Sequence, residues 1–146
     1  MKKILLLVLV VIFLVGCSHY NNTTSRKSKD LIIENVSYDC DTGFFSFTTE
    51  NKGKERVVTG VNYTIEKFDK KWKKTKLTDK IVVAKMATVI SPGEKVEETL
   101  DFSYIEDLKN GKYRISKSYS IGNEMVVKYI KFQYYDGDII NIKTDL

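Results

Sequence analysis

The sequence predicts an all-β protein folded as an antiparallel β-sandwich of about eight strands. Apolar and polar residues alternate with a period of two through most of the chain, for example along 57–65, 113–121 and 126–134. Such alternation is typical of strands with one buried face. The single Pro and the turn-forming Gly, Asn and Asp residues fall between these stretches. They predict short strands joined by tight turns.

The alternation and the turn residues together place each expected element. Strands are expected at 31–38, 43–50, 57–68, 72–77, 81–90, 95–102, 112–121, 126–135 and 139–143. Turns are expected at 51–54, 69–71, 91–94, 109–112, 121–123 and 136–138. One short helical turn is expected at 103–108. No internal linker is long enough to divide residues 31–146, so they are expected to form a single domain.

The first residues have the proportions of a signal peptide. Lys2 and Lys3 precede an unbroken apolar run at 4–15. At about 1.5 Å per residue, a helical run of this length is too short for a hydrocarbon core of about 30 Å. Residues 1–16 are therefore expected to be a signal peptide rather than a membrane span.

The end of this run, Leu14-Val15-Gly16-Cys17, resembles the lipobox of bacterial lipoproteins. The resemblance implies diacylglycerol on the Cys17 sulfur, cleavage before Cys17 and acylation of the new amine by a fatty acid such as palmitate. The protein would then be anchored by lipid at the extracytoplasmic face of the cell membrane, because several acyl chains give stable anchoring. Residues 18–30 are polar, and 17–30 are expected to be a lipidated Cys followed by a flexible tether. The alternative is an ordinary secretory signal or an uncleaved anchor.

Several motifs, in order, resemble small bacterial immunoglobulin-like domains. They lie at 45–52 (FSFTTENK), 63–67 (YTIEK) with Trp72, 90–94 (ISPGE) and 108–115 (LKNGKYRI). The resemblance covers roughly 43–121 and implies an immunoglobulin-like β-sandwich without catalytic residues. It also implies that Tyr113 forms a tyrosine corner, in which the hydroxyl bonds to backbone upstream. The alternative for Tyr113 is an ordinary core position at the start of a strand.

Residues 67–76 (KFDKKWKKTK) are the strongest candidate for a binding surface. They combine the only Trp of the chain with a dense group of lysines. The candidate residues are Trp72, Lys70, Lys71, Lys73 and Lys74. Tryptophan is enriched at interface hot spots, and lysines speed encounter with an anionic partner. The alternative is a solvated hairpin in which Trp72 caps the sandwich and the lysines prevent edge-to-edge pairing.

Other function classes find little support. The formal net charge of +5 falls by two units if Lys2 and Lys3 are removed, so no nucleic-acid partner is expected. The one His lies in the expected tether, and no nucleophile, phosphate-loop or metal-protease motif is present, so neither an enzyme nor a cofactor is expected. Asp39, Asp41, Asp136 and Asp138 are interpreted as turn residues rather than metal ligands.

The chain also holds a second cysteine and a group of tyrosines near its C-terminal end. Cys40 is expected to be unreactive, because two neighbouring carboxylates disfavour a thiolate. Tyr129, Tyr134 and Tyr135 are interpreted as core.

We therefore expect a lipid-anchored cell-envelope module that docks an envelope protein or an anionic polymer through a β-sandwich surface. The alternative is an inhibitor of an extracellular or envelope protease.

Overall fold

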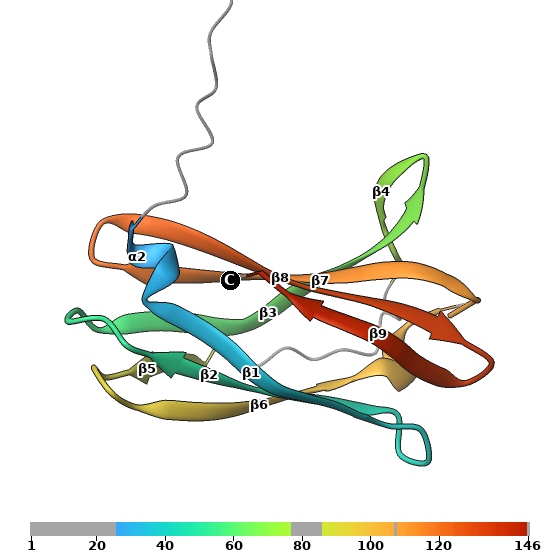
Figure 1. Ribbon diagram of the computed structural model, residues 1–146, viewed down its shortest axis with the longest axis horizontal. Helices are drawn as coiled ribbons and strands as arrows, with labels where there is room; N and C mark the ends of the chain where they lie inside the picture. Colours follow the sequence, from blue (N-terminus) through green and yellow to red (C-terminus); the bar gives the residue numbers. More distant parts are fainter. Residues whose placement is uncertain (1–25, 77–85, 107, 146) are drawn as a thin grey trace, which may run out of the picture.

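The computed structural model describes residues 26–76, 86–106 and 108–145, which form two packed antiparallel sheets (Figure 1). The smaller sheet has the strand order β1-β2-β6, and the larger has the order β4-β3-β7-β8-β9 with β5 also pairing with β3. The strands are β1 (Leu31–Asp39), β2 (Phe44–Asn51), β3 (Val57–Asp69), β4 (Lys71–Lys74), β5 (Ala87–Ile90), β6 (Lys95–Asp101), β7 (Gly111–Ile121), β8 (Glu124–Tyr135) and β9 (Asp138–Thr144). The predicted all-β sandwich is confirmed.

Some elements differ from those expected. The fourth strand is shorter, Lys71–Lys74 instead of 72–77, and its last register partner is Glu66. The fifth begins at Ala87, and residues 81–85 of its expected range lie outside the described residues. A 3-10 turn, η1 (Phe102–Tyr104), replaces the helical turn expected at 103–108. It begins where the Asp101 carboxylate accepts the Ser103 N–H at 2.8 Å, which is ordinary N-cap chemistry.

The end of the expected tether is ordered. A single helical turn, α2 (Arg26–Lys29), leads into β1 and lies against β8. Residues 1–25, with the expected signal peptide and Cys17, lie outside the described residues. In the part of the chain that the structure describes, no helix has the length and apolar character needed to cross a membrane.

Two apolar clusters fill the space between the sheets. The larger contains Ile33, Phe45, Phe47, Ile65, Leu100, Phe102, Ile105, Tyr113, Ile115, Ile130, Phe132 and Ile139. The smaller contains Leu31, Val57, Ile90, Tyr119, Ile121 and Val126. Aromatic rings dominate the larger cluster, where Phe45 stacks on Phe102 at 5.1 Å and Tyr113 stacks on Phe132 at 5.7 Å. Such ring pairs stabilise the fold beyond the area they bury.

A layer of buried or nearly buried polar side chains separates the two clusters. It interrupts four strands between a member of one cluster and a residue in or packed against the other, at Thr59 on β3, Glu98 on β6, Lys117 on β7 and Lys128 on β8. Thr49 on β2 joins the layer through its hydrogen bond to Glu98. The layer therefore divides the core except along β1, where Leu31 and Ile33, one from each cluster, are successive inward residues. Glu98, Lys117 and Lys128 alternate in step with the buried residues Leu100, Ile115 and Ile130 of their strands, which puts them on the inward faces.

Lys117 and Glu98 form an ion pair between the two sheets, with side chains only 4% and 11% exposed. The Lys117 ammonium also donates to the Gly60 carbonyl oxygen at 2.9 Å. Thr49 and Tyr119 donate their hydroxyls to Glu98 Oε1 at 2.7 and 3.2 Å. Burial beside this carboxylate raises the pKa of the Tyr119 hydroxyl far above its ordinary value. Every charge in the network therefore has a partner, as buried charges require.

Lys128 is the cross-strand neighbour of Lys117 and is only 2% exposed. Its ammonium reaches the Asp145 carbonyl oxygen at 3.5 Å. Burial lowers the pKa of the Lys128 ammonium, because the charged form loses hydration.

Tyr113 makes the backbone contact that defines a tyrosine corner. Its hydroxyl donates to the Lys109 carbonyl oxygen at 2.6 Å, and the Lys109 N–H donates back to the hydroxyl at 3.2 Å. The side chain is also buried in the larger cluster, so the corner and the core position coincide in one residue. This double role fixes the start of β7.

Replacing Lys117 by Met should cost about 3–5 kcal/mol of unfolding free energy, because Glu98 would be left as an unpaired buried charge. Adding Glu98→Leu should recover part of that loss, since the Thr49 and Tyr119 hydroxyls, 3.1 Å apart, can then bond to each other. Urea unfolding of both variants measures this. The control is Lys112→Met on the exposed face of β7, expected to change stability by less than about 0.5 kcal/mol. Additive losses in the double variant would contradict the coupling.

Candidate binding surface

The β3–β4 hairpin projects from the body of the sandwich (Figure 1). Its turn lies at Asp69 and Lys70, and Lys70 has a positive φ of 58°. Because strand residues alternate between faces, the lysines of β4 separate. Lys71 and Lys73 point to the opposite side from Trp72 and Lys74, and Lys73 pairs with Asp69 at 2.6 Å.

Trp72 is held against the outer face of the larger sheet, the face turned away from the smaller sheet. The Arg114 guanidinium lies 4.6 Å from the Trp72 ring centroid and 4.6 Å from the Tyr129 centroid. Its Nε donates to Glu66 Oε2 at 2.6 Å. We call Glu66, Trp72, Arg114 and Tyr129 the Arg114 clamp. Cation–π contact and a charge-assisted hydrogen bond together fix the indole on the sheet.

The five predicted binding residues therefore do not form one surface. Trp72 and Lys74 belong to the outer face, Lys71 and Lys73 to the other side, and Lys70 to the turn. Trp72 is half-buried against the outer face of the larger sheet, whereas the alternative for the hairpin placed it as a cap on the sandwich.

Arg114 and Tyr129 are not among the binding residues that the sequence predicts. The core interpretation is wrong for Tyr129, which faces outward, and for Tyr135, which is 59% exposed; only Tyr134 packs against the core. The signal was present, because the alternation already placed Tyr129 opposite the buried Ile130.

A basic pocket of about 360 Å³ opens beside Trp72 on this face. Its lining includes Lys112, Lys131 and Lys143 with the amides of Gln133 and Asn141, and no Asp or Glu. A bulge in β9 creates part of the wall: Asn141 has a φ of 55° and donates its amide to Gln133 Oε1 at 2.9 Å. Bulges of this kind redirect a side chain out of the regular ladder.

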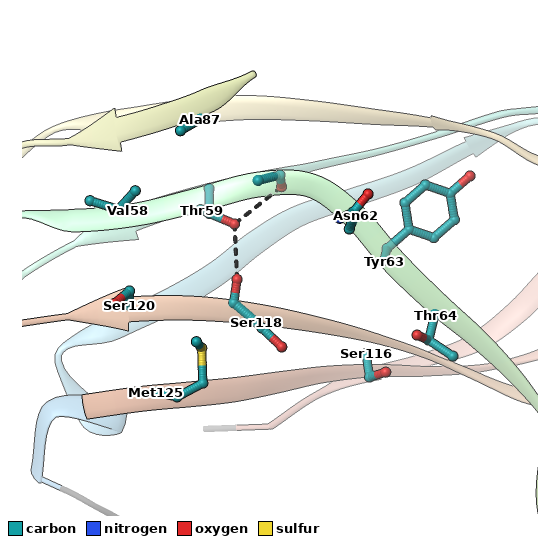
Figure 2. Close-up of a pocket in the computed structure, with 11 residues that line it drawn as sticks. Val58, Thr59, Asn62, Tyr63, Thr64, Ala87, Ser116, Ser118, Ser120 and Met125 are labelled. Atoms are coloured by element: carbon teal, nitrogen blue, oxygen red, sulfur yellow. Dashed lines mark hydrogen bonds between the residues drawn. The ribbon is translucent and has the colours of Figure 1, made fainter. Parts of the chain in front are cut away.

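A second hollow, of about 440 Å³, lies farther along the same face where β3 bulges away from β7. Figure 2 shows Ser116, Ser118, Ser120 and Met125 among the residues that line it. Thr59 ties the bulge to β7, donating its hydroxyl to the Ser118 carbonyl oxygen at 3.0 Å. We call this hollow the serine groove; its lining residues carry no charged side chain.

Comparison with protein families matches residues 25–133 to the bacterial Ig-like domain. The chain belongs to this family. A search of curated proteins returned no match to the chain. The bacterial Ig-like domain is typically a non-catalytic β-sandwich and is consistent with a generic binding or accessory module.

In this bacterial Ig-like domain, Asp39, Asp136 and Asp138 make hydrogen bonds within and between the turns. Asp39 accepts the Asp41 N–H at 2.9 Å, and Asp138 accepts the Ile139 N–H at 2.7 Å. Asp136 exchanges hydrogen bonds with Asn110, which joins two neighbouring loops. Among the described residues, no group of three or more His, Cys, Asp or Glu converges as a metal site.

Cys40 is exposed in the β1–β2 turn. No disulfide partner lies near it within the described residues.

Arg114→Met should loosen Trp72, because both the cation–π contact and the anchor to Glu66 are lost. Trp72 is the only Trp, so its fluorescence reports this site alone. We expect emission at longer wavelength and stronger quenching by acrylamide than in the unmodified protein. Lys95→Met, which removes the partner of Glu34 on the smaller sheet, is the control and should leave both readings unchanged. Unchanged quenching in Arg114→Met would contradict the clamp.

Proposed function

We propose that this chain is a lipid-anchored cell-envelope module that docks an envelope protein or an anionic polymer through the outer face of its larger sheet. The observation that supports this proposal is the Arg114 clamp. It holds a half-buried Trp72 at the surface beside the lysine-lined pocket. A preorganised aromatic residue loses little side-chain entropy on binding, and surrounding lysines steer an anionic partner.

The larger sheet suits docking better than the hairpin tip. The tip lysines project into solvent, and Lys73 is already paired with Asp69. By contrast, the outer face offers a fixed ring, a guanidinium and two hollows on one surface. Exposed charges alone contribute little affinity, whereas a fixed aromatic residue in a concave setting is typical of hot spots.

The anchor rests on the lipobox resemblance at 14–17 and on the apolar run before it. With α2 packed on β8, the polar residues between Cys17 and α2 would set the reach of the domain from the membrane. The predicted alternative, protease inhibition, remains a prediction without a supporting contact among the described residues.

Docking is tested by crosslinking in cells, followed by identification of what is captured. The variant Trp72→Ala with Lys74→Ser alters the outer face, and Lys71→Ser with Lys73→Ser is the matched control on the opposite side. We expect the outer-face variant to lose a specific envelope component that the wild type and the control retain. Equal capture by all three proteins would reject this surface, and no specific capture would reject docking.

Cys17→Ser should release the protein from the membrane, because the thiolate that would carry diacylglycerol is gone. We expect the variant in the soluble fraction at the mass of a chain without lipid, and the wild type in the membrane fraction at a higher mass. Cys40→Ser is the matched control and should fractionate like the wild type. A Cys17→Ser variant that carries the same lipid mass as the wild type would contradict lipid anchoring through Cys17.

A further inference from the structure

We propose that the outer face of the larger sheet binds an extended anionic polysaccharide, which lies along β7 from the serine groove to the basic pocket. This inference rests on the proposed docking function and names the chemistry of the partner. The juxtaposition that supports it is a hydroxyl-lined hollow and a lysine-lined hollow on one sheet face, with clamped aromatic rings between them.

A single row of side chains connects the two hollows. Alternate residues of β7 face outward, in the order Ser120, Ser118, Ser116, Arg114 and Lys112. At about 3.4 Å per residue, the row spans roughly 27 Å. The three serines line the groove, Arg114 is the centre of the clamp, and Lys112 lines the basic pocket. A ligand that touches both hollows must therefore be long and extended.

The lysines of the basic pocket favour an anionic ligand at one end of this row. Lys131 pairs with Asp145 at 3.0 Å, whereas Lys112 and Lys143 have no carboxylate partner among the described residues. No acidic side chain lines either hollow, and Glu66 is engaged with Arg114. Two exposed ammonium groups without counterions favour a ligand that brings its own negative charge.

The neutral groups favour sugar rings over a lipid headgroup or a bare polyanion. Within the described residues, the hydroxyls of Ser116, Ser118 and Ser120 make no hydrogen bond, so they are available to ligand hydroxyls. Gln133 and Asn141 add amide donors and acceptors in the basic pocket. Trp72 lines the basic pocket, where its ring offers apolar surface for the C–H face of a sugar. A ligand that uses all of these groups carries hydroxyls, apolar ring faces and anionic groups in one chain.

The test measures binding of the full chain, purified in detergent, by calorimetry. The anionic probes are oligogalacturonates and heparin oligosaccharides, each as a disaccharide and as a long oligomer. Maltooligosaccharides supply sugar without charge, and polyphosphate supplies charge without sugar. We expect the long anionic oligosaccharides to bind at least about tenfold tighter than their disaccharides. They should also bind tighter than the maltooligosaccharides or polyphosphate.

Variants at the two ends separate the subsites. Lys112→Gln with Lys143→Gln should weaken both short and long anionic oligosaccharides about tenfold. Ser118→Val should weaken the long oligomers and leave the disaccharides unchanged. Lys95→Gln on the smaller sheet is the control, and unfolding by urea verifies that each variant is folded.

Three results would overturn the polysaccharide inference. These are equal affinity for polyphosphate and for the long oligosaccharides, affinity that does not depend on length, and no binding of any anionic oligosaccharide. If these occur while capture in cells still depends on Trp72, the docking function stands with a protein partner and only the inference fails. If capture in cells does not depend on Trp72 either, the docking surface itself is rejected.

Discussion

The ion pair between Lys117 and Glu98 is the constraint around which the two sheets are aligned. Each charge is nearly buried, and each has its partner on the opposite sheet. A shift of two residues along either strand would keep its apolar side chains inward but would move one charge away from its partner and leave both charges buried and unpaired. Hydrophobic faces tolerate small displacements more readily, because apolar contacts are not directional. The pair therefore specifies register where the two apolar clusters alone would not.

The same ion pair is connected to the outer surface through the bulge of β3. Lys117 donates to the Gly60 carbonyl oxygen, inside the irregular segment of β3 between Thr59 and Tyr63. That irregularity is what opens the serine groove on the other side of the sheet (Figure 2). β7 thus contributes to both the core and the outer surface. Its inward residues build the core, and its outward residues build the proposed binding row. Tyr113 fixes the start of this strand by its bond to Lys109.

The pattern of the sequence predicts the strands because period-two alternation records which face is buried. It also predicts that Lys117, Lys128 and Glu98 point inward, but it does not predict which charges meet. That pairing depends on how the sheets are stacked, and β6 and β7 belong to different sheets. Of the Arg114 clamp, the sequence singled out only Trp72, because Arg114 and Tyr129 come from strands distant in sequence. The bulge at Asn141 was not anticipated, since a positive φ at a single Asn leaves no periodic signal.

The polar layer also has a consequence for how the domain tolerates sequence change. On β3, β7 and β8 the residues of the two apolar clusters are held apart by the layer, whereas on β1 Leu31 and Ile33, one from each cluster, are successive inward residues. A cavity made in one cluster is therefore bordered by hydrogen-bonded groups that resist collapse, and its effect stays on its own side. Substitutions in different clusters should combine additively, while those within one cluster should be coupled. Sequence drift can then remodel one end of the sandwich while the packing of the other end is preserved.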